Sequence, residues 1–221
     1  MEINPNNPGG DGQKNGERFL IGLVLALAVL VGAGSWLAIG LLSHHEKARG
    51  IPPDHARQLV DFSLTDSAGR NVTRAELQGK ILVVSFLFTG CSLTCPEVTK
   101  RMAEIQQLTT GQTDVRLLSL TVDPRSDTPP VLAKWAARFG ADTNRWWMLT
   151  GDKTMLHEVI GTSFLTRDAG DPFNSMPGNF VGTDRIAVVD RHGSVRIFFD
   201  GLRPETSAAI AAQVNQLRGE Q

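Results

Sequence analysis

The chain has 221 residues, with 22 Lys and Arg against 23 Asp and Glu and a net charge of -1. This near-neutral balance, without a long basic run, excludes the electrostatic footprint of a nucleic-acid-binding protein. The only thiols are those of Cys91 and Cys95, which excludes a disulfide-framework mini-protein and a four-thiolate zinc site.

The N-terminal part contains two segments of opposite composition. Residues 1-18 are rich in Asn, Gly and Pro, which predicts a disordered tail. Residues 19-42 carry no charged side chain and would form about 36 Å of helix, enough to cross a hydrocarbon core of about 30 Å. Because the apolar region of a cleavable signal peptide is only about 7 to 15 residues long, we favour an uncleaved, single-pass transmembrane helix over that alternative. Charges on both flanks leave its orientation open.

A folded domain is expected after a short connection. Residues 43-58 are polar, contain Pro52 and Pro53, and are predicted to be a tether between the membrane and the domain. The remaining residues, 59-221, are a suitable length for one domain with one hydrophobic core.

The strongest predicted strand is the near-continuous apolar run from Ile81 to Thr89. Such a run is typical of a strand that is covered on both faces. From Pro96 onward, apolar residues recur at helical spacing, and a helix tolerates proline in its first turn. Cys91 and Cys95 are therefore expected where a buried strand leads into a helix.

The second half of the domain continues the alternation. A second strand is predicted from Val115 to Val122, followed by turn and cap residues at Asp123 to Thr128 and by a helix that starts at two prolines. Residues 185-190 and 194-199 predict a hairpin, and the apolar spacing of residues 210-217 predicts a closing helix. The order strand, helix, strand, helix, hairpin, helix predicts an α/β fold, a thioredoxin-like three-layer sandwich.

The four-residue spacing of Cys91 and Cys95 indicates which chemistry the two thiols can perform. Residues four apart in the first turn of a helix lie on one face, so the two sulfurs can bind one ion or form one disulfide. The helix N-terminus lowers the pKa of a thiol there, and two soft thiolates suit Cu(I). The alternative is a structural pair, as a quiet disulfide or as two buried thiols.

Several motifs between Phe62 and Leu149 resemble the Sco/SenC family, membrane-anchored thioredoxin-like proteins of copper delivery to cytochrome c oxidase. They include SFLFTGCSLTCP at residues 85-96 and TVDPRSDTP at residues 121-129. The resemblance implies that Cys91 and Cys95 bind Cu(I), and that the oxidase's copper-bearing subunit is a partner. It also implies that the N-terminal tail is cytoplasmic and that the domain lies on the periplasmic or equivalent side.

The family has one further metal ligand, a histidine, which the resemblance places at about Gly182, where this chain has none. His192 lies one strand farther on, roughly 20 Å away, and is a poor substitute. Met176 lies in the same Gly- and Pro-containing segment, and its soft thioether is the better candidate for a third ligand. The remaining histidines fall in a predicted helix or on the tether: His157, His44, His45 and His55.

Two functions follow from these patterns. The first is a membrane-anchored copper-binding protein in which Cys91 and Cys95 hold Cu(I), with Met176 or a partner's residue completing the site, and assist assembly of the oxidase's dinuclear copper centre. The second is a thiol-disulfide oxidoreductase that acts on a periplasmic thiol protein without stable copper binding. In that case Cys91 attacks the partner's disulfide and Cys95 resolves the mixed disulfide. The missing histidine weakens the first function only, whereas the family resemblance favours it.

Overall fold

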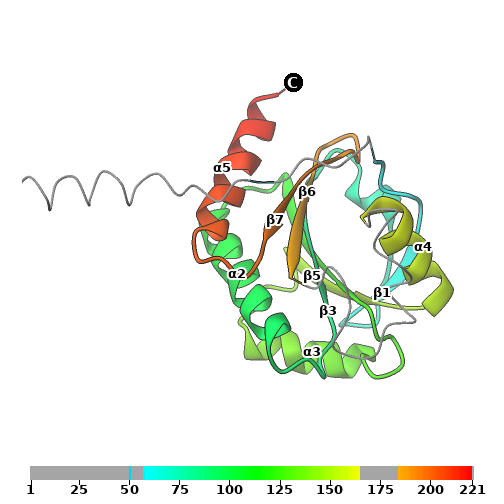
Figure 1. The fold of residues 1–221 in the computed structure, drawn as a ribbon. Helices are drawn as coiled ribbons and strands as arrows, with labels where there is room; N and C mark the ends of the chain where they lie inside the picture. The colour runs from blue at the N-terminus through cyan, green and yellow to red at the C-terminus, as the bar shows by residue number, and fades with distance from the viewer. Residues whose placement is uncertain (1–49, 51–56, 165–183, 221) are drawn as a thin grey trace, which may run out of the picture. The chain divides into compact units, whose positions relative to one another are not determined.

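The computed structural model describes residues 50, 57–164 and 184–220 (Figure 1). Within them, seven strands form one mixed sheet in the order β2-β1-β5-β4-β3-β6-β7. The strands are β1 (Ser63–Asp66), β2 (Asn71–Thr73), β3 (Ile81–Leu87), β4 (Val115–Thr121), β5 (Trp146–Thr150), β6 (Arg185–Val189) and β7 (Val195–Asp200). The helices are the short 3-10 helix η1 (Arg74–Leu77), then α2 (Thr94–Leu108), α3 (Pro129–Arg138), α4 (Lys153–Ser163) and α5 (Thr206–Gly219).

Strand β3 is an interior strand of the sheet, beside the central strand β4, and confirms the predicted buried strand. All of its residues are buried, and it pairs in parallel with β4 and antiparallel with β6. It ends at Leu87 rather than at the predicted Thr89, because the backbone N–H of Thr89 leaves the ladder and donates to the Asp127 carboxylate, 3.1 Å from Oδ1. Strand β4 likewise ends at Thr121, one residue before the predicted end.

Helices cover both faces of the sheet, as the three-layer prediction requires. On one face, buried residues of α2, α3 and α5 share a core with one side of β3 and β4. On the other face, α4 packs on the alternate residues of the same strands. Figure 1 shows α4 across the sheet from α2 and α5. Burial on both faces explains why the run of β3 is apolar except for Ser85, whose hydroxyl is hydrogen-bonded to that of Ser119 at 2.8 Å.

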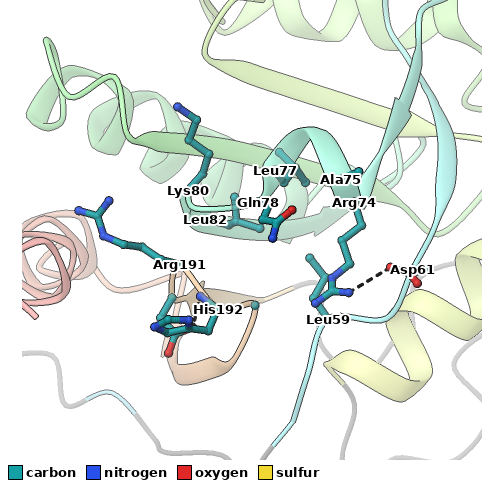
Figure 2. A pocket seen from close by; sticks show the side chains of 12 residues that line it. Leu59, Asp61, Arg74, Ala75, Leu77, Gln78, Lys80, Leu82, Arg191 and His192 are labelled. Atoms are coloured by element: carbon teal, nitrogen blue, oxygen red, sulfur yellow. Dashed lines mark hydrogen bonds and ion pairs between the residues drawn. The ribbon is translucent and has the colours of Figure 1, made fainter. Parts of the chain in front are cut away.

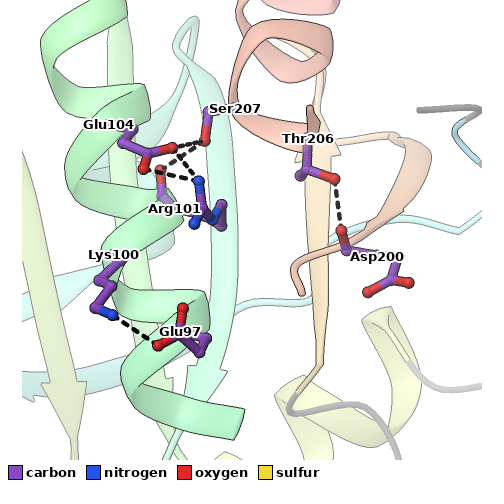
Figure 3. Close-up of polar contacts among 7 residues, drawn as sticks. All are labelled: Glu97, Lys100, Arg101, Glu104, Asp200, Thr206 and Ser207. Atoms are coloured by element: carbon purple, nitrogen blue, oxygen red, sulfur yellow. Dashed lines mark hydrogen bonds and ion pairs between the residues drawn. The ribbon is translucent and has the colours of Figure 1, made fainter. Parts of the chain in front are cut away.

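Polar contacts fix α5 beside α2 (Figure 3). The Ser207 hydroxyl donates to Glu104 Oε2 at 2.6 Å, and Arg101 forms an ion pair with the same oxygen at 2.6 Å. At the start of α5, the Thr206 hydroxyl donates to the backbone carbonyl of Asp200 at 2.5 Å. The closing helix is therefore held against α2, the helix that begins at Thr94.

The predicted hairpin is formed by β6 and β7. Its turn closes with Gly193 at φ +83, a left-handed conformation that glycine adopts without steric cost. Asp190 Oδ1 accepts the N–H groups of His192 and Ser194 and so fixes the turn. Gln58 bridges to Ser194, and the Val195 N–H donates to the Arg57 carbonyl at 2.9 Å. In the described part, the chain is therefore paired with the hairpin from Arg57 onward.

Two details differ from the sequence-based expectations. Helix α2 begins at Thr94, two residues before Pro96, and α3 begins at Pro129 with Thr128 as its N-cap residue. The expected side-chain cap is wrong, because Thr128 makes no cap hydrogen bond and Asp127 turns into the interior instead.

Several predictions fall outside the described residues. Among the residues that the structure describes, none of the helices combines the length and apolar character needed to cross a bilayer. The predicted tail, the predicted transmembrane helix at residues 19-42 and most of the tether lie outside that part. The same holds for these candidate metal-site positions: Met176, Gly182, His44, His45 and His55.

Candidate cysteine site

Cys91 and Cys95 lie at the end of the sheet where β3 leads into α2. After β3, the Cys91 N–H donates to the Phe88 carbonyl at 3.1 Å and closes a turn. The N-cap residue of α2 is Leu93, so Cys95 lies in the first helical turn and Cys91 precedes the helix. The prediction placed both cysteines in the first turn, and the structure corrects this for Cys91.

The two sulfurs nevertheless share one environment. The backbone N–H of Cys95 donates to Cys91 Sγ at 3.2 Å, and the Thr94 hydroxyl lies 3.3 Å from the same sulfur. The first N–H groups of a helix have no partner within the helix, and Leu93 offers no side-chain cap. Cys91 Sγ therefore acts as the cap acceptor, a position at which negative charge is stabilised.

The two thiols are electrostatically unequal. Partial burial disfavours the Cys91 thiolate, but hydrogen bonds from Cys95, Thr94 and the Leu93 backbone outweigh it and lower the pKa of Cys91 to about 7. Burial raises the pKa of Cys95 to about 12, and hydrogen bonding with Cys91 adds to the rise. The expected lowering of the thiol pKa thus holds for Cys91 and is wrong for Cys95, whose exposed fraction is 0%.

Cys95 is also held rigidly from the α3 side. The Thr99 hydroxyl donates to the Cys95 carbonyl at 2.6 Å, and Trp135 Nε1 donates to that hydroxyl at 3.2 Å. Cys95 packs in the same core cluster as Val98 and Met102 of α2. One cysteine is therefore part of the core, and the other, Cys91, is half-buried at its edge.

Asp127 is the site residue whose role the sequence reasoning missed. The turn predicted around it exists, since the Asp127 N–H donates to the Asp123 carbonyl at 2.9 Å. Its side chain, however, is buried and accepts hydrogen bonds from Thr89 and Thr121. A signal was present in the sequence, because both threonines directly follow or end apolar strands where a buried acceptor would be needed.

The described part of the chain contains two histidines, His157 and His192. His157 is exposed on α4, which covers the opposite face of the sheet from α2. His192 lines a pocket of about 340 Å³ with Lys80 and Arg74 (Figure 2). Because Lys80 directly precedes β3, this pocket lies at the other end of the sheet, about 20 Å from the cysteines. Neither histidine forms a group with Cys91 and Cys95 that could hold a metal ion.

Within the described residues, the sulfurs of Cys91 and Cys95 are the candidate metal ligands. The described part of the chain contains no cluster of three or more His, Cys, Asp or Glu side chains placed to hold a metal ion. Two sulfurs suit a soft ion such as Cu(I), which accepts low coordination numbers and thiolate ligands. The same pair can form one disulfide, since neither cysteine is bonded to another.

Known proteins match this chain over most of its folded part. A curated relative, the "SCO1 protein homolog" of Bacillus subtilis, is 36% identical over 159 residues, which cover 69% of this chain and 82% of that protein. Among solved structures, BsSco, described as a member of the Sco family of cytochrome c oxidase assembly proteins with a disulfide switch, is 26% identical with a TM-score of 0.63. The match covers 75% of this chain and 96% of BsSco.

A second solved structure is similar to this chain and contains copper. Bradyrhizobium japonicum ScoI with copper bound is 25% identical with a TM-score of 0.55, and the match covers 70% of this chain and 98% of ScoI. The family model described as SCO1/SenC matches residues 52–218, which include both cysteines and the whole sheet. These matches confirm the resemblance noted in the motifs and the Sco-type thioredoxin-like fold, and the chain belongs to the SCO1/SenC family.

Proposed function

We propose that this chain is a copper carrier that holds Cu(I) with the Cys91 and Cys95 thiolates and delivers it to the dinuclear copper centre of cytochrome c oxidase. The observation that carries the proposal is the cysteine pair at the α2 N-terminus, with Cys91 Sγ only 3.2 Å from the Cys95 N–H. The copper-bound ScoI relative and the oxidase-assembly description of BsSco support the same reading.

The unequal thiols give the binding step a defined proton count. A thiol must lose its proton to bind the metal. With a pKa of about 7, Cys91 is about half ionised at pH 7, whereas Cys95 with a pKa of about 12 is protonated. Cu(I) binding at pH 7 therefore releases about 1.5 protons, with Cys91 as the first ligand and Cys95 as the second.

We propose Met176 as a third ligand within this chain. Strand β6 begins beside the cysteine end of β3, because Ile186 pairs with Ser85. The chain between Met176 and Asp184 spans at most about 28 Å when extended, which permits the thioether to approach the cysteines. In a Met176→Ala variant, Cu(I) retention against a competing chelator should fall while the fold is unchanged. If Cu(I) retention is unchanged in this variant, Met176 is not a ligand.

Delivery is tested with the apo form of the oxidase's soluble copper-bearing domain. The Cu(I)-loaded full chain should pass its metal to that domain, measured by copper content after the two proteins are separated. The matched control is the Cys91→Ser, Cys95→Ser double variant exposed to the same copper. If transfer from the double variant equals transfer from the natural chain, the proposed carrier role is incorrect.

A second function is favoured by the asymmetry of the cysteines. A half-buried thiol with a pKa of about 7 beside a buried thiol suits an attacking and a resolving cysteine. In this reaction the Cys91 thiolate displaces one sulfur of a partner disulfide. Cys95 then closes the Cys91–Cys95 disulfide and releases the partner as a dithiol. A Cys95→Ser variant should trap the mixed disulfide through Cys91, and failure to trap an oxidised periplasmic thiol protein would argue against this chemistry.

We further propose that residues 19-42 anchor the chain in the membrane as a single helix, with the domain on the periplasmic or equivalent side. The uncharged apolar segment supports this assignment. In spheroplasts, protease added from outside should digest the domain, and the chain should resist extraction from membranes at high pH. If the domain is protected from external protease, the proposed orientation is wrong.

A further inference from the structure

Asp127 is a fully buried carboxylate that neither proposed chemistry uses directly. Its exposed fraction is 0%. Its Oδ1 accepts the Thr89 hydroxyl and its Oδ2 accepts the Thr121 hydroxyl, both at 2.5 Å. The backbone N–H of Thr89 donates to both oxygens, at 3.1 and 3.2 Å. Burial of a carboxylate is costly unless donors replace water, so these donors are what permit it to lie inside.

The hydrogen bonds of Asp127 join three segments that are distant in the sequence. Thr89 follows β3, Thr121 is the last residue of β4, and Asp127 directly precedes the N-cap of α3. The loop that carries Asp127 is itself fixed, because the Asp123 N–H donates to the Thr121 hydroxyl oxygen at 3.0 Å. Asp127 is therefore a rigid anchor rather than a mobile loop side chain.

The anchor acts on the turn that carries Cys91. Thr89 is the second residue of that turn, which the Cys91 N–H closes on the Phe88 carbonyl at 3.1 Å. Asp127 holds Thr89 by both its backbone and its side chain. Cys95 is held separately, through Thr99 of its own helix. The distance between the two sulfurs thus depends on two separate contacts. Asp127 fixes the Cys91 turn through Thr89, and Thr99 fixes Cys95.

We propose that Asp127 is a positioning residue for the cysteine pair: through Thr89 it holds the Phe88-to-Cys91 turn against the start of α2, so that both sulfurs can bind one Cu(I) or form one disulfide. A pre-organised pair loses less conformational freedom when it closes. This inference rests on the proposed use of the cysteine pair, but it holds for either of the two chemistries.

The test is a glutathione equilibrium of the full chain, which needs no copper. The reduced Cys91 and Cys95 thiols react with one oxidised glutathione to give the Cys91–Cys95 disulfide and two reduced glutathione molecules, so two electrons and two protons pass to glutathione. The Asp127→Asn variant keeps the shape of the side chain but loses one acceptor oxygen. Its equilibrium constant for forming the Cys91–Cys95 disulfide should fall at least threefold. Asp123→Asn is the matched control, because Asp123 lies in the same loop and does not contact Thr89, and its constant should change less than threefold.

Unfolding of the reduced proteins in urea is measured beside the equilibrium. A merely structural role lowers the stability of the reduced and oxidised forms alike and leaves the glutathione constant unchanged. A fall of less than threefold in Asp127→Asn, or an equal fall in the control, would overturn the proposal. If Asp127→Asn does not fold, the same glutathione equilibrium is measured for Thr89→Val, which removes the hydroxyl donor to Asp127. The same threefold threshold then decides the test. A natural chain that binds no Cu(I) would refute the copper carrier but not this inference.

Discussion

The low pKa of Cys91 depends on a few hydrogen bonds, and Thr94→Val tests one of them. Removal of the Thr94 hydroxyl, 3.3 Å from Cys91 Sγ, takes away one of four contacts that together lower the pKa of Cys91 from 9.0 to about 7. We expect the pKa to rise by roughly half a unit to one unit, or about 0.7 to 1.4 kcal/mol. The thiolate fraction at pH 7 should then fall from about one half by roughly two- to fivefold.

The assay is the rate of alkylation by iodoacetamide between pH 5 and pH 10, with peptide mass spectrometry to distinguish Cys91 from Cys95. In the natural chain, Cys91 should be half-maximally reactive near pH 7 and should lose reactivity as the pH falls below it, whereas buried Cys95 should stay unmodified. Ser92→Ala, in an exposed residue of the same loop, is the control. An unchanged profile in Thr94→Val, or equal shifts in both variants, would refute this account of the Cys91 pKa.

Two further predictions concern the scaffold. Met102→Ala should lower the free energy of unfolding in urea by about 2 to 5 kcal/mol, because Met102 of α2 is fully buried. Leu108→Ala on the same helix, where the side chain is 53% exposed, should change it by under about 1 kcal/mol, and equal losses would contradict the assigned burial. Burial disfavours the Asp114 carboxylate, but Arg218 and Arg191 outweigh it and keep the pKa of Asp114 below 3.8. Its contribution, at most about 1 kcal/mol for partly exposed pairs, is present above about pH 4 and lost as the pH falls through the lowered pKa. The stability difference between Asp114→Asn and the natural chain should therefore shrink as the pH falls below about 4, and a difference that does not change with pH would disprove the ion-pair assignment.

The features that depend on local patterns could be predicted from the sequence. The near-continuous apolar run from Ile81 identified the buried strand β3, and the spacing from Pro96 identified α2. Their junction located both cysteines, since a strand and the next helix meet at one end of a sheet. The hairpin was predictable from the turn residues that end in Gly193.

The features that depend on distant contacts could not be predicted in this way. The threonines at the two strand ends indicate that a buried acceptor is needed, but they do not identify it. Asp127 resembles a cap residue in the sequence, and only the folded structure shows that it accepts hydrogen bonds from Thr89 and Thr121. The high pKa of Cys95 has the same origin, because its burial in the core that α2, α3 and α5 share is not encoded in the C-x-x-x-C spacing. Strand β5 begins with Trp146, whose Nε1 donates to Ser119 of β4 at 2.9 Å, a pairing that no local pattern indicates.

The most direct test of the copper carrier is an anaerobic Cu(I) titration of the reduced full chain at pH 7 against a chelator of known affinity, with proton release recorded at the same time. The account predicts one tightly held Cu(I) per chain, about 1.5 protons released per Cu(I), and loss of both signals in the Cys91→Ser, Cys95→Ser double variant. Weak binding, or binding that the double variant retains, would contradict the claim that these two cysteines carry copper, and the pair would then be a redox couple.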